Sequence, residues 1–177
     1  LYIAGNFGKI VLGGNDAVTD NFGIGEQDIM SEEVTGTYTN ATIQSNACEK
    51  TYGADSDKVS YFAPAMGPLT VGVSYMDGGV AGDTDSTSFG GKLAIGDNIT
   101  VGYTNGQQEV SGAIDNESQN IGAKIALGDL TVIGAMSTVE GADEDIETIG
   151  AGASYKLNAD TTIAISTMES EDALDVS

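Results

Sequence analysis

Apolar and polar side chains alternate along most of this chain from residue 56 onward. In one such run, Ile121, Ala123, Ile125 and Leu127 share one side, and Asn120, Gly122, Lys124 and Ala126 share the other. Because successive side chains of a β-strand point to opposite faces, this period of two predicts strands. No segment shows a convincing apolar stripe with the 3.6-residue period of a helix. The pattern therefore predicts an all-β chain.

Ten strands can be placed from the alternation. Their ranges are 1–5, 8–13, 56–63, 69–76, 86–95, 99–106, 118–127, 130–138, 146–156 and 161–168. Short turn-forming connections alternate with longer acidic ones at 77–85, 107–117, 139–145 and 169–177, and one much longer segment covers 14–55. Tight reversals at one end and long loops at the other are typical of an antiparallel up-and-down barrel of the outer-membrane type.

The two faces of the predicted strands differ in chemistry. One face is apolar, and the other carries Gly, Ser, Thr and Ala with an occasional Lys, which suits the wall of a water-filled lumen. No apolar run approaches the ~18 residues that a membrane-spanning helix needs, so only strands could cross a membrane. Aromatic residues near strand ends favour interfacial girdles; they are Tyr61, Phe62, Tyr75, Tyr103 and Tyr155. These features predict a transmembrane β-barrel.

The composition excludes several functions. The chain has 27 Asp and Glu residues against 6 Lys, no Arg, no His and a formal net charge of −21. Such a charge repels a nucleic-acid backbone, and the lack of His excludes Ser-His-Asp, Cys-His and His-ligated zinc chemistry. Carboxylate pairs are inevitable among so many acids, so we expect no enzyme. The lone Cys48 is expected to be an inert, partly buried thiol, with a reactive or metal-binding thiol as the alternative.

Two hairpins resemble hairpins of a known family. Residues 57–75, DKVSYFAPAMGPLTVGVSY, look like a recurrent hairpin of Gram-negative general porins, in which an aromatic strand end meets a Pro-containing turn and returns to Ser-Tyr. Residues 3–13, IAGNFGKIVLG, resemble the porin hairpin with a Gly-x-Phe-Gly turn that precedes the long third loop. Their order, with the longest loop between them, is more specific than either hairpin alone.

The resemblance implies a trimeric porin of the outer membrane of a Gram-negative bacterium. In the family's register, the ten strands correspond to strands four through thirteen of a sixteen-stranded barrel. Residues 1–177 are then expected to be a single barrel domain that is incomplete at both ends. The implied partners are outer-membrane lipid and lipopolysaccharide, two further copies in a homotrimer, and small hydrophilic solutes that diffuse passively.

By the same resemblance, residues 14–55 are the loop that constricts the pore. Its candidate acidic residues are Asp16, Asp20, Glu26, Asp28, Glu32 and Glu33. A solvated surface loop is the alternative. The FGIG run of residues 22–25 lacks the Pro found in some relatives' loops, so which acid faces the aperture stays open.

Five lysines share the small-residue face, and they are Lys9, Lys58, Lys92, Lys124 and Lys156. Three of them, Lys92, Lys124 and Lys156, lie two to four residues before a short turn and so at similar height. Opposite an acidic loop they would produce a transverse field, for which porins usually use Arg clusters. Solvated or snorkelling lysines near the turns are the alternative. The acidic loop predicts a preference for cations.

Acidic loops also offer oxygen ligands for hard cations. Asp143, Glu144 and Asp145 are candidates for Ca²⁺ or Mg²⁺, although no EF-hand spacing is present and a solvated acidic surface is the alternative. No other cofactor is expected. A rival function is a secreted acidic β-rich adhesin or filament protein that binds divalent cations. The rival requires the apolar face to be buried against a second sheet, whereas a porin exposes it to lipid; the residues concerned are Val71, Val73, Leu93, Ile95, Ile99, Val101, Ile125 and Leu127.

Overall fold

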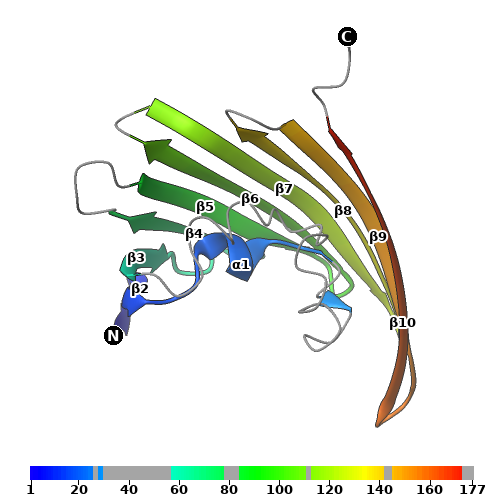
Figure 1. Ribbon diagram of the computed structural model, residues 1–177. Helices are drawn as coiled ribbons and strands as arrows, with labels where there is room; N and C mark the ends of the chain where they lie inside the picture. The colour runs from blue at the N-terminus through cyan, green and yellow to red at the C-terminus, as the bar shows by residue number, and fades with distance from the viewer. Residues whose placement is uncertain (26–27, 30–56, 78–83, 111–112, 142–144, 173–177) are drawn as a thin grey trace.

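A single antiparallel sheet of ten strands forms the protein (Figure 1). The computed structural model describes residues 1–25, 28–29, 57–77, 84–110, 113–141 and 145–172. The strands are β1 (Tyr2–Gly5), β2 (Gly8–Gly14), β3 (Asp57–Phe62), β4 (Leu69–Met76), β5 (Thr84–Ile95), β6 (Ile99–Val110), β7 (Ala113–Leu127), β8 (Leu130–Gly141), β9 (Asp145–Asn158) and β10 (Thr161–Asp172). Each strand pairs with its neighbours in sequence, so the predicted up-and-down arrangement is confirmed. Within these residues the sheet is open, since β1 and β10 are its two edges and do not pair with each other.

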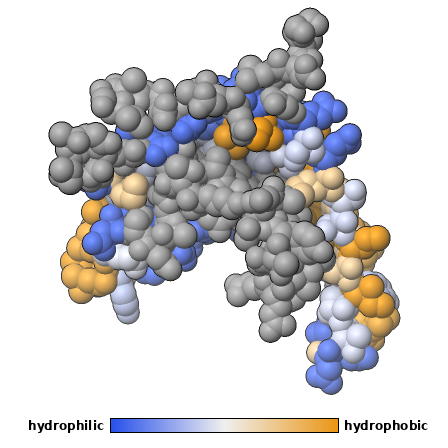
Figure 2. All heavy atoms as spheres, viewed as in Figure 1, coloured by the Kyte–Doolittle hydropathy of each residue, from blue (hydrophilic) through white to orange (hydrophobic). Residues whose placement is uncertain are grey.

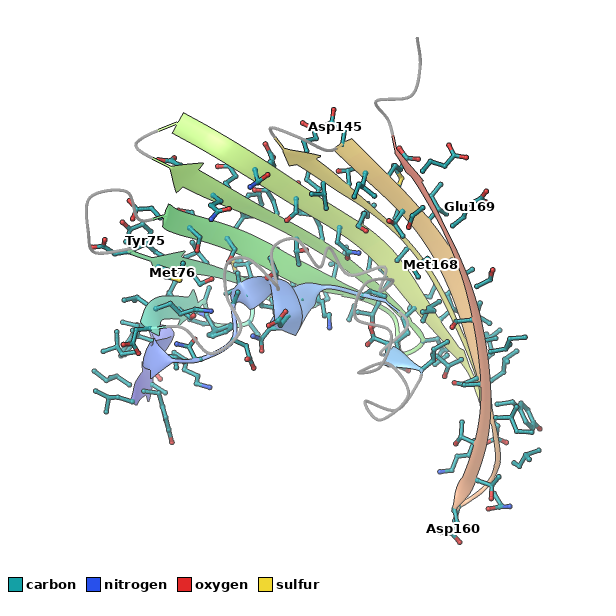
Figure 3. The ribbon with its side chains drawn as sticks, in the orientation of Figure 1. Tyr75, Met76, Asp145, Asp160, Met168 and Glu169 are labelled. Carbon is teal, nitrogen blue, oxygen red and sulfur yellow. The ribbon has the colours of Figure 1, made fainter. Side chains whose placement is uncertain are left out.

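Five short connections join the strands at one end of the sheet: residues 6–7, 63–68, 96–98, 128–129 and 159–160. Glycines with φ of 107°, 64°, 61° and 64° lie in or beside four of them, at Gly8, Gly67, Gly96 and Gly128. Only glycine adopts this left-handed region without a steric cost. Asp160 marks the short-turn end in Figure 3 and Asp145 the opposite end. The short turns therefore all lie at one end of the sheet, as predicted.

At the opposite end the strands are longer than the sequence predicted. β6 and β7 continue to Val110 and from Ala113, β8 continues to Gly141, and β10 continues to Asp172. Much of the expected loops at 107–117, 139–145 and 169–177 is therefore strand, and that part of the prediction was wrong. Apart from Val110, Ala113, Ile114 and Val139, the residues of these strand ends are polar or glycine, so the regular alternation stops there. The backbone ladder nevertheless continues, with Gln107 opposite Glu117 and Glu117 opposite Glu140.

A short helix, α1 (Val18–Phe22), lies on the concave side of the curved sheet and packs against β4, β5 and β6 (Figure 1). Five residues are too few to show a helical stripe, so the sequence did not predict it; packing against the sheet stabilises so short a helix. Buried apolar side chains between this segment and the sheet form a small core: Ala17, Val18, Phe22, Ile24, Ile133 and Ala135. Among the described residues, no helix has the length and apolarity to cross a membrane.

Over the part of the strands that leads to the short turns, the convex face of the sheet is apolar and exposed. Its large side chains include Val73, Leu93, Ile95, Ile125 and Leu127, all of which were predicted to face lipid, and no second sheet covers them within the described chain. Figure 2 shows hydrophobic side chains along the outer flank on the β10 side, where Ile163 and Ile165 are exposed. This observation favours a membrane-facing surface over the adhesin alternative.

The aromatic residues near the strand ends do not all share that face. Tyr75 and Tyr155 are exposed on the convex face, as an interfacial girdle requires. Phe62 instead lies on the concave face, where its ring centre is 6.0 Å from that of Phe22. The assignment of Phe62 to a girdle was therefore wrong, because the alternation of β3 turns it inward together with Ser60.

Candidate functional site

The concave face is lined by small side chains. Residues directly opposite in an antiparallel ladder share a face, so the register can be followed from strand to strand. Gly72 lies opposite Gly90, Gly102 opposite Gly122, and Ser74 opposite Ser88. The segment that contains α1 lies on these positions, which places them on the concave side. A wall of such small residues leaves room for chain or solvent inside the curve.

Charge is segregated between the two faces. All five lysines of the strands occupy concave-face positions: Lys9 opposite Phe62, Lys58 opposite Gly13, Lys92 opposite Gly102, Lys124 opposite Thr100, and Lys156 opposite Thr162. Among the strand side chains that the structure describes, the carboxylates occupy convex-face positions: Asp57, Asp85, Glu109, Glu117, Glu140, Asp145, Glu147, Glu169 and Glu171. Figure 3 labels Glu169, whose neighbour Met168 points to the opposite face. Although the chain as a whole is strongly acidic, the charged strand side chains that the structure describes on the concave face are therefore basic.

Hydrogen bonds fix the start of the segment that crosses this wall. The Asn15 side-chain nitrogen donates to the Gly13 carbonyl oxygen at 2.6 Å, and Ser60 Oγ donates to Asn15 Oδ1 at 2.7 Å. The backbone N–H of Val18 donates to Ser74 Oγ at 3.3 Å. The chain is thus turned from the end of β2 onto the inside of β3 and β4.

Glycines form a trough for the next residues. A Cβ atom at Gly72 would lie 3.0 Å from Phe22 Cε2, and one at Gly90 would lie 3.1 Å from Phe22 Cβ. A Cβ atom at Gly122 would lie 2.7 Å from Ile24 Cβ. Real Cβ atoms essentially never approach within 3.0 Å and seldom approach within 3.4 Å, so the lack of side chains at these positions lets the segment lie against the sheet.

Asn120 on β7 binds the segment at both backbone groups of one residue. Its Oδ1 accepts from the Ile24 N–H at 3.3 Å, and its Nδ2 donates to the Ile24 carbonyl oxygen at 3.4 Å. Asn120 and Ile24 are each only 1% exposed. The side-chain amide therefore takes the place of a strand partner for Ile24.

Beyond Ile24 the chain turns at Gly25 and Asp28. The Asp28 N–H donates to the Gly25 carbonyl oxygen at 3.0 Å, and the Gly25 N–H donates to Asp28 Oδ2 at 3.1 Å. Asp28 Oδ1 lies 3.5 Å from Lys124 Nζ. One acid of the predicted loop and one lysine of the predicted wall are thus brought together.

The other candidate residues are placed differently. Asp16 is exposed and Asp20 is half-buried on α1. Lys58 is 4% exposed and buried beneath α1, so it does not face open solvent. Lys9 lies over the rings of Tyr2 and Phe62, 5.4 and 5.9 Å from their centres. Lys92 and Lys156 form no ion pair with a described residue. Glu26, Glu32, Glu33 and Cys48 lie outside the described residues.

Sequence reasoning missed α1 and Asn120. The glycines of the trough were visible as small residues at alternate positions, but nothing in the sequence showed what lies on them. A repeated run, KLAIGD at 92–97 and KIALGD at 124–129, was also overlooked. It places Lys92 and Lys124 at the same distance from their turns, which supports the predicted similar height.

The described residues contain no group of three or more His, Cys, Asp or Glu side chains arranged to hold a metal ion. Of the candidate metal ligands, Asp145 accepts a hydrogen bond from the Gly141 N–H at 3.4 Å. Asp143 and Glu144 lie outside the described residues. Binding of Ca²⁺ or Mg²⁺ here stays a prediction.

A curved antiparallel meander with an apolar convex face, a small-residue concave face and a segment folded across it defines an outer-membrane β-barrel protein. The family model for Gram-negative porins matches residues 1–176. The chain belongs to this family, and it is a protein of the Gram-negative outer membrane. No curated protein is similar enough in sequence to match.

Solved structures share the fold. The anion-selective porin from Comamonas acidovorans has a TM-score of 0.67 at 14% identity and matches over 97% of this chain and 56% of its own. A loop L8 deletion mutant of OmpT, an outer membrane protein of Vibrio cholerae, has a TM-score of 0.65 at 15% identity, and the match covers 96% of this chain and 60% of the mutant. In-vitro folded OmpT of Vibrio cholerae in its trimer form has a TM-score of 0.51 at 16% identity, and the match covers 97% of this chain and 69% of that one. The chain therefore spans less than two thirds of the length of the first two.

Proposed function

We propose that the full-length protein forms a water-filled, non-enzymatic channel for passive diffusion of small hydrophilic solutes and ions across the outer membrane. The observation that carries this proposal is the asymmetry of the sheet, whose apolar face is exposed while its opposite face is small, polar and lysine-bearing. Membership of the porin family supports it. Residues 15–25, which belong to the predicted constriction loop, lie against the concave face, and this position supports the proposal.

Liposome swelling tests this proposal. Vesicles containing the folded full-length protein are placed in isosmotic solutions of neutral sugars of increasing size. We expect swelling that slows as the sugar becomes larger, because a pore of fixed width sieves uncharged solutes. Folding is checked by heat-modifiable migration on a gel. Folded protein that gives no swelling with any sugar would contradict the proposal.

A modest preference for cations is the finer part of the proposal. It rests on the acids of residues 14–55, while the lysines of the wall act against it. Screening over about 8 Å at 0.15 M salt limits it further. Replacing Glu26, Asp28, Glu32 and Glu33 by Gln or Asn should shift the zero-current potential toward anions. The same replacement of Asp143, Glu144 and Asp145 should change it little, and the reverse pattern would refute the assignment.

We also propose a homotrimer whose outer surface contacts lipid and lipopolysaccharide. Its support is the family and the trimer form of one structural neighbour. Native mass spectrometry in mild detergent should give three copies of the chain, and a monomer under all mild conditions would count against this part.

A further inference from the structure

We infer that Asn120 is the positioning residue that holds residues 17–25 against the barrel wall and so sets the width of the lumen at this level. The inference rests on the proposed channel function and names a residue that determines its aperture.

The hydrogen bonds of Asn120 are reciprocal. One side-chain amide accepts from the Ile24 N–H and donates to the Ile24 carbonyl oxygen, across 96 residues of sequence. This is the pattern by which a neighbouring strand would bind one residue of an extended chain. Because both residues are almost fully buried, losing the amide would leave the N–H and the C=O of Ile24 without these partners and away from water.

Ile24 can lie beside Asn120 only because the neighbouring wall positions are glycines. Gly122 lies two residues further along β7 on the same face, and Gly102 lies opposite it on β6. A Cβ atom at Gly102 would lie 2.9 Å from Ile24 Cγ1, and one at Gly122 would lie 2.8 Å from the Ile24 carbonyl oxygen. The glycines permit the close approach, and Asn120 supplies the directional bonds that hold it.

The strand ladder does not depend on the Asn120 side chain. Asn120 lies opposite Thr104 on β6 and Ser137 on β8, and these pairings are made by backbone groups. A substitution at Asn120 is therefore expected to release the segment while β7 keeps its place. Four residues beyond Ile24, Asp28 reaches Lys124, so the same anchor also determines where this carboxylate lies.

Thiol labelling measures the anchoring without any use of channel activity. In full-length protein with Cys48→Ser, an Ile24→Cys substitution places a reporter thiol at the buried position. With Asn120 intact, a water-soluble maleimide should react slowly. Asn120→Leu should accelerate the reaction about tenfold or more, since two buried hydrogen bonds are lost. Asn120→Asp keeps the acceptor for the Ile24 N–H and should give an intermediate rate.

Two glycine variants complete the test. Gly122→Ala should also accelerate labelling, because its methyl group displaces the backbone and the reporter side chain at position 24. Gly134→Ala is the matched control, since a Cβ atom there meets nothing within 4 Å, and it should leave the rate unchanged. An unchanged rate in folded Asn120→Leu would overturn the inference. Failure of both Asn120 variants to fold would overturn it too, because the residue would then be needed by the barrel and not by the segment.

Single-channel recording separates this inference from the proposed function. Asn120→Leu, with the native Ile24, should show increased open-channel noise from a released segment, whereas Gly134→Ala should not. If labelling changes as expected but even the parent protein conducts nothing, the channel proposal fails and the anchoring stands. If the parent conducts and Asn120→Leu alters neither labelling nor noise, the anchoring fails alone.

Discussion

Lys124 on β7 places its ammonium nitrogen 3.5 Å from Oδ1 of Asp28 and so joins the strand wall to the segment that crosses it. The side chains are 36% and 19% exposed, respectively. An ion pair with this much solvent contact contributes at most about 1 kcal/mol to stability. Its larger consequence is electrostatic, because each charge cancels much of the field of the other inside the lumen.

Removing one member of this pair should change ion selectivity more than stability. In Asp28→Asn the ammonium of Lys124 loses its counter-charge, so the zero-current potential in a salt gradient should move toward anions. The shift should fade as salt rises to 1 M, where the screening length is about 3 Å.

The double variant Asp28→Asn with Lys124→Gln provides the control for this prediction. Both charges are absent, so the potential should return close to that of the parent protein. A double variant that keeps the full shift of Asp28→Asn would show that the two charges do not compensate one another.

The turn glycines should differ in their tolerance of a methyl group. Gly96 has φ of 61° and open space around it, so Gly96→Ala should lower the free energy of unfolding by about 1 kcal/mol, from left-handed strain alone. Gly8 has φ of 107°, and a Cβ atom there would collide with the carbonyl oxygen of Phe62. Gly8→Ala should therefore cost roughly 3 kcal/mol. Urea unfolding in detergent measures both, and equal losses would contradict the described hairpin geometry.

Neighbouring residues of β8 should differ in how much an added charge destabilises the protein. Val132 lies on the convex face and is exposed there, whereas Thr131 lies opposite Ser154 on the concave face. Val132→Lys should destabilise the protein in phospholipid vesicles by at most about 2–4 kcal/mol, which is the cost of a lysine at the bilayer midplane, because it places an ammonium on the lipid-facing side. Thr131→Lys should cost less than about 1 kcal/mol. Denaturant unfolding in vesicles distinguishes them, and a greater loss for Thr131→Lys would invert the assignment of faces.

Strand positions and faces were predictable because a two-residue period persists wherever one face is apolar, as in residues 121–127. The same parity predicted the face of β7 that Lys124 occupies. The strand ends near Glu117 and Glu140 were not predictable, since most residues there are polar and no regular alternation accompanies the backbone pairing. Asn120 could not be found either, because its partner is the backbone of a residue 96 positions away and backbone groups leave no sequence signal. Asp28 could not be singled out from the other loop acids either, because its partner Lys124 also lies 96 positions away in the sequence.

Like charges directly opposite each other on β9 and β10 offer a stabilising substitution. Glu147 lies opposite Glu171, and both are on the exposed convex face. Glu147→Lys should raise the free energy of unfolding by about 0.2–1 kcal/mol, because repulsion between the carboxylates is replaced by attraction. The gain should be smaller at 1 M salt, and Glu147→Gln should give an intermediate value. A destabilised Glu147→Lys protein would contradict the pairing.

Planar-bilayer recording on the full-length protein tests the channel account most directly. Folded protein added at low concentration to a salt-bathed membrane should produce discrete, stepwise increases in current, each step nearly proportional to voltage, as a permanently water-filled lumen requires. Protein that inserts and shows heat-modifiable folding, yet leaves the membrane current at its baseline, would contradict a channel.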